Sequence, residues 1–84
     1  MEIRTSAHFE RQYKKITKEV REKAKKQEQF FIADPFDSRL VTHKLHGKDQ
    51  GKWAYSVDYE YRIKFLFLGG GKVLYLDIGT HDEV

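Results

Sequence analysis

The first fifteen residues alternate and then change to a helical pattern. Residues 1–5 place apolar or uncharged side chains on one face and charged ones on the other, which predicts a short strand with one solvent-exposed side. Ser6 is a favoured helix N-cap, so we expect a helix over residues 7–15. The side chains expected on its inner face are Ala7, Phe9, Tyr13 and Ile16.

A longer helical pattern follows, which we expect to begin at a Thr17 cap and to end near Ala33. Asp34-Pro35 marks its end, because the residue before a proline avoids helical geometry. The outer face is rich in lysine and glutamate, which is typical of a solvated helix face; the alternative is contact with RNA phosphates or an acidic partner. The inner positions are Val20, Ala24, Gln27 and Phe31, with Phe30 beside them.

The second half of the chain has the period of two that strands require. Residues 53–57 and 61–68 predict two strands joined by a turn. Three glycines at 69–71 then predict a hairpin loop into a last strand over residues 73–78, which we expect Gly79 to end. In the middle strand one face holds Tyr61, Ile63, Phe65 and Phe67, and the other holds Arg62, Lys64, Leu66 and Leu68.

Between the helices and these strands, residues 40–45 are expected to be extended or irregular. They lead into a flexible, positively charged loop over residues 46–52. The order strand, helix, helix and three strands predicts an α+β fold. In it, two N-terminal helices pack on one face of a small twisted antiparallel sheet, and residues 1–84 form a single domain.

Composition changes this picture in two ways. The chain of 84 residues has a formal net charge of +3, and a basic surface favours polyanions such as nucleic acid, with plain solubility as the equal alternative. It contains no cysteine, which fits a reducing cytoplasm and removes thiolate chemistry. Neither a signal-peptide pattern nor a membrane-spanning apolar run is present, so we expect a cytoplasmic protein without a membrane partner.

Five short stretches follow one another in a recognisable order. They are Ser6-Ala7-His8-Phe9, Lys44-Leu45-His46-Gly47, Trp53-Ala54-Tyr55-Ser56-Val57, Tyr61-Arg62-Ile63 and the closing Ile78-Gly79-Thr80-His81-Asp82-Glu83-Val84. Over nearly its whole length the chain resembles the RelE/ParE superfamily of toxins from bacterial type II toxin–antitoxin pairs, most closely the RelE and YafQ-like branch. The resemblance implies a RelE-like fold and an endoribonuclease that cleaves mRNA, usually on the ribosome, with the RNA's own 2′-hydroxyl. It also implies a cognate antitoxin as partner.

The resemblance assigns roles to three residues. His81 matches a C-terminal histidine that acts in YafQ-like and YoeB-like members. His43 matches a position before the loop where relatives carry histidine or glutamate, and Arg62 matches a strand arginine that faces the scissile phosphate. Attack by a 2′-hydroxyl needs a base, an acid and a cation for the charge that builds on phosphorus. We therefore expect His81 as the acid, Arg62 as the phosphate ligand and His43 as the base, with His46 or a lysine as the alternative base.

Other side chains have broader roles. Trp53, Tyr55 and Tyr61 could stack on bases, although alternating aromatics in a small sheet are more typical of a core. His8 is expected to be structural. The chain shows no metal-ligand spacing, and 2′-hydroxyl chemistry needs no metal, so no cofactor is expected. Phosphate contacts, or simple solvation, are expected for Lys44, Lys48, Lys52 and Lys64.

Two further hypotheses differ from the ribonuclease. The ParE branch shares the fold but inhibits DNA gyrase without cleaving RNA. An inactive homologue that only binds an antitoxin is the other possibility, because YafQ-like members often carry arginine where this chain has Asp77. For Arg62, the alternative to phosphate binding is a structural pairing with Asp58, Glu60 or Asp77.

Overall fold

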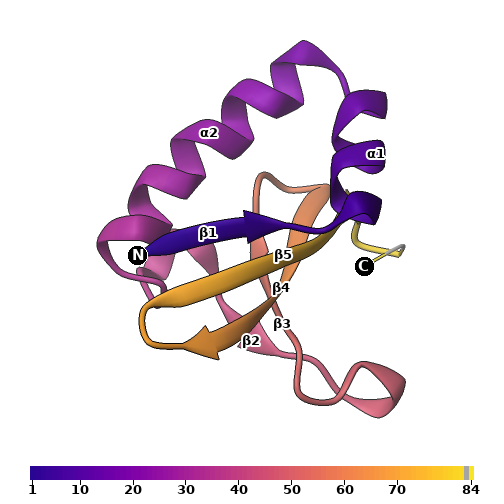
Figure 1. The fold of residues 1–84 in the computed structure, drawn as a ribbon. Helices are drawn as coiled ribbons and strands as arrows, with labels where there is room; N and C mark the ends of the chain where they lie inside the picture. Colours follow the sequence, from indigo (N-terminus) through magenta and orange to yellow (C-terminus); the bar gives the residue numbers. More distant parts are fainter. Residues whose placement is uncertain (83) are drawn as a thin grey trace.

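The computed structural model describes residues 1–82 and residue 84, and it confirms the expected α+β fold (Figure 1). Glu83, part of the closing stretch, lies outside the described residues. The elements are β1 (Glu2–Thr5), α1 (Ala7–Lys15), α2 (Lys18–Ala33), β2 (His43–Lys44), β3 (Trp53–Ser56), β4 (Tyr61–Gly69) and β5 (Lys72–Thr80). Short 3₁₀ turns occupy Ser38–Leu40 and Gly47–Asp49.

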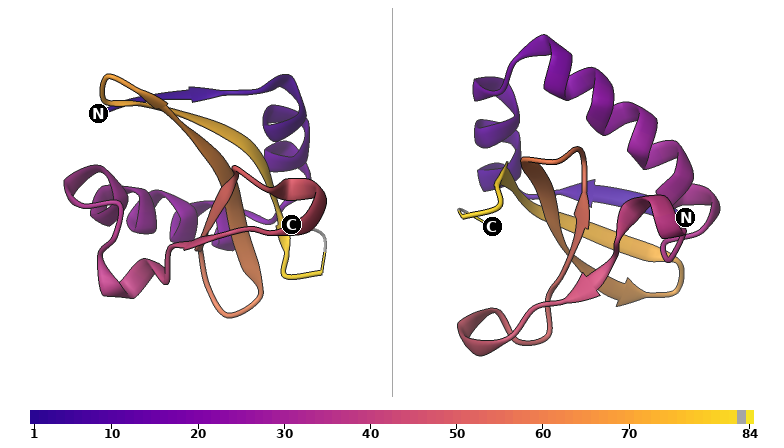
Figure 2. Two further views of the ribbon diagram at one scale, coloured as in Figure 1. Left: turned by 90° about the horizontal axis from the view of Figure 1, so that it is seen from below. Right: turned by 180° about the vertical axis from the view of Figure 1, so that it is seen from behind.

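The five strands form one sheet in the order β1-β5-β4-β3-β2. The pairs from β2 to β5 are antiparallel, as expected, but β1 runs parallel to β5, so the sheet is mixed rather than wholly antiparallel. Both helices lie on one side of the sheet, and the β2–β3 loop projects from the other side (Figures 1 and 2). Neither helix in the described part of the chain is long and apolar enough to cross a membrane.

Gly79 does not end the last strand, contrary to the sequence prediction. β5 continues through Gly79 to Thr80, because the backbone there stays paired with β4, where Arg62 is the partner of Gly79. A glycine weakens a strand only by its entropy and missing side chain, and this one lies buried within a continuous ladder. His81 therefore leaves the sheet directly opposite the start of β4.

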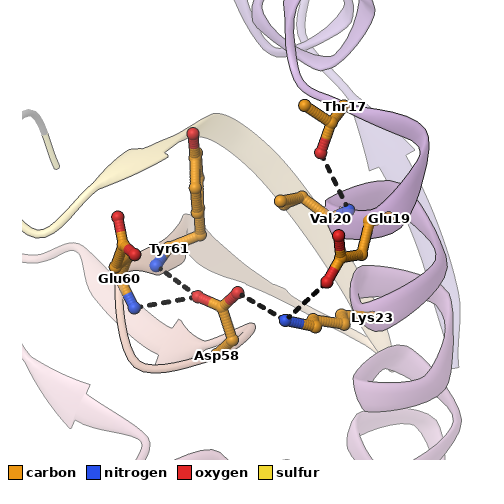
Figure 3. A network of polar contacts seen from close by, with 7 residues as sticks. All are labelled: Thr17, Glu19, Val20, Lys23, Asp58, Glu60 and Tyr61. Atoms are coloured by element: carbon orange, nitrogen blue, oxygen red, sulfur yellow. Dashed lines mark hydrogen bonds and ion pairs between the residues drawn. The ribbon is translucent and has the colours of Figure 1, made fainter.

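Side-chain caps fix both helix starts as predicted. Ser6 Oγ accepts a hydrogen bond from the backbone N–H of Phe9 at 3.0 Å, and Thr17 Oγ1 accepts one from Val20 at 3.3 Å (Figure 3). Ser6 Oγ also donates to the Leu76 carbonyl at 3.0 Å, which attaches the start of α1 to β5.

An aromatic cluster around Phe31 joins α2 to the sheet. The Phe31 ring stacks on Tyr55 at 4.6 Å between centroids and meets the edge of Phe65 at 4.9 Å. The predicted inner positions Val20, Ala24 and Phe31 are all buried, as are Tyr55, Ile63 and Phe65. Trp53 and Tyr61 pack partly buried against this core.

One inner-face prediction fails at the rim of the core. Ala7 is exposed, because it begins α1 and only Phe9 of that helix is fully buried. Phe67, expected on the same face of β4 as Ile63 and Phe65, is exposed, since β4 extends beyond the cover of the helices. There its ring packs against Trp53 and Phe36, at 5.4 and 6.0 Å between centroids.

Candidate functional site

An open cavity of about 850 Å³ lies beside the ends of β3 and β5 and the start of β4. Side chains reach it from α2, from the segment after α2, from the β3–β4 turn and from the C-terminal segment. The residues that line it are Gln27, Arg39, Val41, Ser56, Asp58, Tyr59, Glu60, Arg62, Thr80, His81 and Asp82.

The β4–β5 ladder brings Arg62 and His81 to this cavity together. Arg62 is paired with Gly79, and Tyr61 with Thr80, so His81 follows at the end of the same ladder. The backbone N–H of His81 then donates to the Glu60 carbonyl at 2.9 Å, which fixes the backbone of His81 beside the β3–β4 turn. The His81 side chain remains exposed, and its Nδ1 lies 3.8 Å from Asp82 Oδ1.

His43 contacts the site through Arg62. Its Nε2 lies 3.4 Å from Arg62 Nη1, and its Nδ1 lies 2.9 Å from the Val41 carbonyl oxygen. A carbonyl can only accept, so Nδ1 carries the proton and Nε2 presents its lone pair. In the neutral form of the ring, the basic nitrogen of His43 therefore faces a guanidinium at the cavity.

Two of the three carboxylates proposed as structural partners of Arg62, those of Asp58 and Asp77, contact other groups. Asp58 accepts hydrogen bonds from the backbone N–H groups of Glu60 and Tyr61, both at 2.8 Å. Asp77 is largely buried, and its Oδ1 lies 3.2 Å from His8 Nε2. This contact joins α1 to β5, in keeping with the structural role expected for His8.

The remaining predicted residues lie in or near the β2–β3 loop rather than at the cavity. Lys52 and Lys64 both contact Asp49 Oδ1, at 3.3 and 3.4 Å, and so attach the loop to β4. Burial alone would raise the pKa of Asp49, but these two ammonium groups outweigh burial and lower the pKa. Lys44 lies over the Trp53 ring at 5.4 Å, and both His46 and Lys48 are exposed.

Arg39 belongs to the cavity and has no counterpart in the sequence prediction. It makes a two-pronged contact with Asp37, at 2.9 and 2.7 Å, and its guanidinium lies 3.6 Å from the centre of the Phe30 ring. Hydrogen bonds from Arg39 lower the pKa of Asp37 to about 2. Arg39 is thus a fixed second guanidinium at the site.

The electrostatic character of the cavity is mixed. Alongside the cations, three of its lining residues are acidic, namely Asp58, Glu60 and Asp82. No group of three or more His, Cys, Asp or Glu side chains among residues 1–82 and 84 is arranged to hold a metal ion. Besides these carboxylates, the groups available for chemistry are two guanidinium groups and the imidazoles of His43 and His81.

Comparison with known proteins gives matches in structure but not in sequence. The sequence matches no protein-family model, and no curated protein sequence matches it. The YoeB/ParE toxin from Agrobacterium tumefaciens superposes with a TM-score of 0.80 at 18% identity, over 96% of this chain and 99% of that chain. YafQ from E. coli superposes with a TM-score of 0.81 at 17% identity, over 98% and 94% of the two chains.

This chain has the fold of the YoeB and YafQ toxins. The E. coli DinJ–YafQ toxin–antitoxin complex also matches, with a TM-score of 0.78 at 17% identity over 99% of this chain and 94% of that chain. The resemblance to the RelE/ParE superfamily is thus confirmed for the fold.

Four residues that line the cavity were missed in the sequence. Gln27 was taken only as an inner helix position, although its side-chain amide donates to the carbonyls of Ser56 and Arg39, at 2.9 and 3.1 Å. The others are Arg39, Val41 and Tyr59, which lie in connecting segments where no periodic pattern applies. Asp37 and Asp58, which precede Arg39 and Tyr59 in turns, are the local signals that point to fixed loop geometry there.

Proposed function

We propose that this protein is the toxin of a type II toxin–antitoxin pair and that it cleaves mRNA on the ribosome. The observation that carries the proposal is the contact between His43 and Arg62 beside a cavity that Arg62 shares with His81. Base, cation and acid are the three groups that 2′-hydroxyl attack on a phosphodiester requires. The shared fold with YoeB and YafQ supports the same conclusion.

The reaction follows from these roles. A phosphate bound by Arg62 draws its guanidinium away from His43, and Nε2 of His43 then accepts the proton of the 2′-hydroxyl. A bond forms between the 2′-oxygen and phosphorus, while Arg62 stabilises the added negative charge. The bond to the 5′-oxygen breaks as protonated His81 donates a proton to it. The products are a 2′,3′-cyclic phosphate and a 5′-hydroxyl.

The partners follow from the fold and the charges. A cognate antitoxin is proposed because the YafQ of the matching complex is bound to the antitoxin DinJ. Lys44 of β2 and Lys48 of the projecting loop, both exposed, are proposed to contact RNA phosphates. Lys52 and Lys64 contribute positive charge nearby while they hold the loop through Asp49.

The test uses purified protein, ribosomes programmed with mRNA, and mapping of the 3′ ends. Wild-type protein is expected to leave cyclic phosphates, and His81→Ala and Arg62→Ala to lower the cleavage rate by about 10²–10³-fold. Arg11→Ala, which removes an exposed arginine from α1, serves as the matched control and should cleave like wild type. Equal cleavage by all four proteins, or none by wild type, would disprove the proposal.

Gyrase inhibition is the second candidate function, and the three carboxylates in the cavity favour it because they oppose RNA phosphates. It predicts that the protein abolishes supercoiling by purified gyrase. It also predicts that mRNA stays intact in cells that express the protein. Retained supercoiling together with mRNA cleavage excludes it.

A further inference from the structure

Tyr59 stands apart from the other tyrosines of the described chain. It is 99% exposed, whereas Tyr55 and Tyr75 are buried and Tyr13 and Tyr61 are half-buried. Folding therefore buries none of its ring, although aromatic rings gain more than most side chains from burial. An exposed ring at the edge of a cavity therefore indicates a ligand contact more strongly than an exposed ring on a flat surface does.

The turn that displays this ring is held in place on several sides. Asp58 Oδ1 accepts the backbone N–H groups of Glu60 and Tyr61, and its Oδ2 lies 3.4 Å from Lys23 Nζ on α2 (Figure 3). The backbone N–H of Val57 also donates to the Tyr61 carbonyl at 2.8 Å. The backbone of Tyr59 is thus fixed by its neighbours, while its ring is left to contact something else.

The same turn positions the proposed catalytic groups. Glu60, the next residue after Tyr59, accepts the backbone N–H of His81 at 2.9 Å. Tyr59, Arg62 and His81 all line the one cavity. A ligand there meets a flat π-surface beside a guanidinium and an imidazole, and a nucleotide has the base and the phosphate that match these groups.

We propose that Tyr59 stacks on the base of a nucleotide next to the phosphate bound by Arg62. The inference rests on the proposed ribonuclease function and makes Tyr59 a positioning residue for its substrate. Stacking accepts any base, so this contact orients single-stranded RNA without selecting a sequence.

Binding is tested apart from cleavage, with a 2′-O-methylated RNA oligonucleotide that has no 2′-hydroxyl to attack and with the same oligonucleotide made abasic. Tyr59→Ala is expected to weaken binding of the first by about 10- to 100-fold, the range of stacking on one base, while Tyr59→Phe binds normally. On the abasic oligonucleotide, wild type and Tyr59→Ala should bind equally. Phe36→Ala, which removes another exposed ring outside the cavity, should keep the wild-type preference for bases.

A spectroscopic measurement separates stacking from a structural effect. In the double variant Trp53→Phe, Tyr59→Trp the only indole lies on the turn, and its fluorescence should be quenched by the normal oligonucleotide and not by the abasic one. Quenching in a protein that cleaves no RNA supports the stacking and defeats only the catalytic proposal. Cleavage with no quenching, or equal affinities of wild type and Tyr59→Ala, overturns the stacking and leaves the ribonuclease standing.

Discussion

Nε2 of His43 lies 3.4 Å from Nη1 of Arg62, although β3 runs between their strands. His43 is paired with Ala54, and Ala54 with Lys64, so these side chains and that of Arg62 share one face of the sheet. Neighbouring strands are about 4.8 Å apart, so the two side chains must reach across β3. They can do so because Ala54, completely buried between them, adds only a methyl group.

We predict that the neutral imidazole of His43 carries its proton on Nδ1. The Val41 carbonyl, 2.9 Å from Nδ1, can only accept a hydrogen bond, and it fixes this tautomer without help from Arg62. Nitrogen-15 NMR of the histidine rings above pH 8 should therefore report a bare Nε2 in wild type and equally in Arg62→Ala. A dominant Nε2–H form would remove His43 as the base.

We predict that the backbone conformation of Val41 lowers the free energy of unfolding. It is a β-branched residue in the left-handed region, at φ 52°, where ordinary L-residues lose about 1–2 kcal/mol. Val41 as a whole residue is 62% exposed, so replacing it forfeits little burial. Val41→Asn, which tolerates this geometry, should raise the free energy of unfolding in urea by roughly 1 kcal/mol.

The matched control for Val41 is Ile32→Asn, also an exposed aliphatic residue but one within the helix α2. It should give no gain, because its backbone is not strained. If Val41→Asn gains no stability over wild type and behaves like Ile32→Asn, the backbone at position 41 carries no strain that asparagine relieves.

Local signals in the sequence were sufficient for most of the fold. The caps at Ser6 and Thr17 and the period of two in β3 and β4 depend on neighbouring residues, and the structure follows them. The parallel pairing of β1 with β5 joins residues some 70 positions apart, and no local pattern encodes it. For the same reason the continuation of β5 through Gly79 was missed, since pairing with β4 decides it.

The site was only partly predictable. His43, Arg62 and His81 could be selected by residue type and resemblance, but their spatial relations depend on strand register. Arg39 and Tyr59 come to the cavity through turns that Asp37 and Asp58 fix, and a turn's place in the molecule depends on everything around it. Their contribution could be found only from coordinates.

The buried tyrosine pair offers a test of the core. Tyr55 Oη lies 2.8 Å from Tyr75 Oη, and burial raises the pKa of both hydroxyls. Tyr55→Phe leaves the Tyr75 hydroxyl without this partner and should lower the free energy of unfolding by about 1–3 kcal/mol. The double Tyr→Phe variant should lose less than the sum of the two single variants, a coupling that a denaturant double-mutant cycle measures. Strict additivity would mean that the hydroxyl contact contributes nothing.

The final prediction concerns Asp58, which holds the β3–β4 turn. Burial alone would raise its pKa, but the backbone N–H groups of Tyr61 and Glu60 and the ammonium of Lys23 outweigh burial and lower it below its usual 3.8. A carboxyl whose pKa is lower in the folded state stabilises the fold above the unfolded-state pKa, and that contribution is lost as the pH falls through the folded-state pKa. Asp58→Asn should therefore flatten the fall in stability below about pH 4.

In carbon-13 NMR, Lys23→Gln should move the Asp58 midpoint upward, whereas Lys25→Gln, an exposed lysine on the same helix, should leave it unchanged. If Lys23→Gln also leaves the midpoint in place, the turn is held by its own backbone alone and α2 does not steady the residue that displays Tyr59.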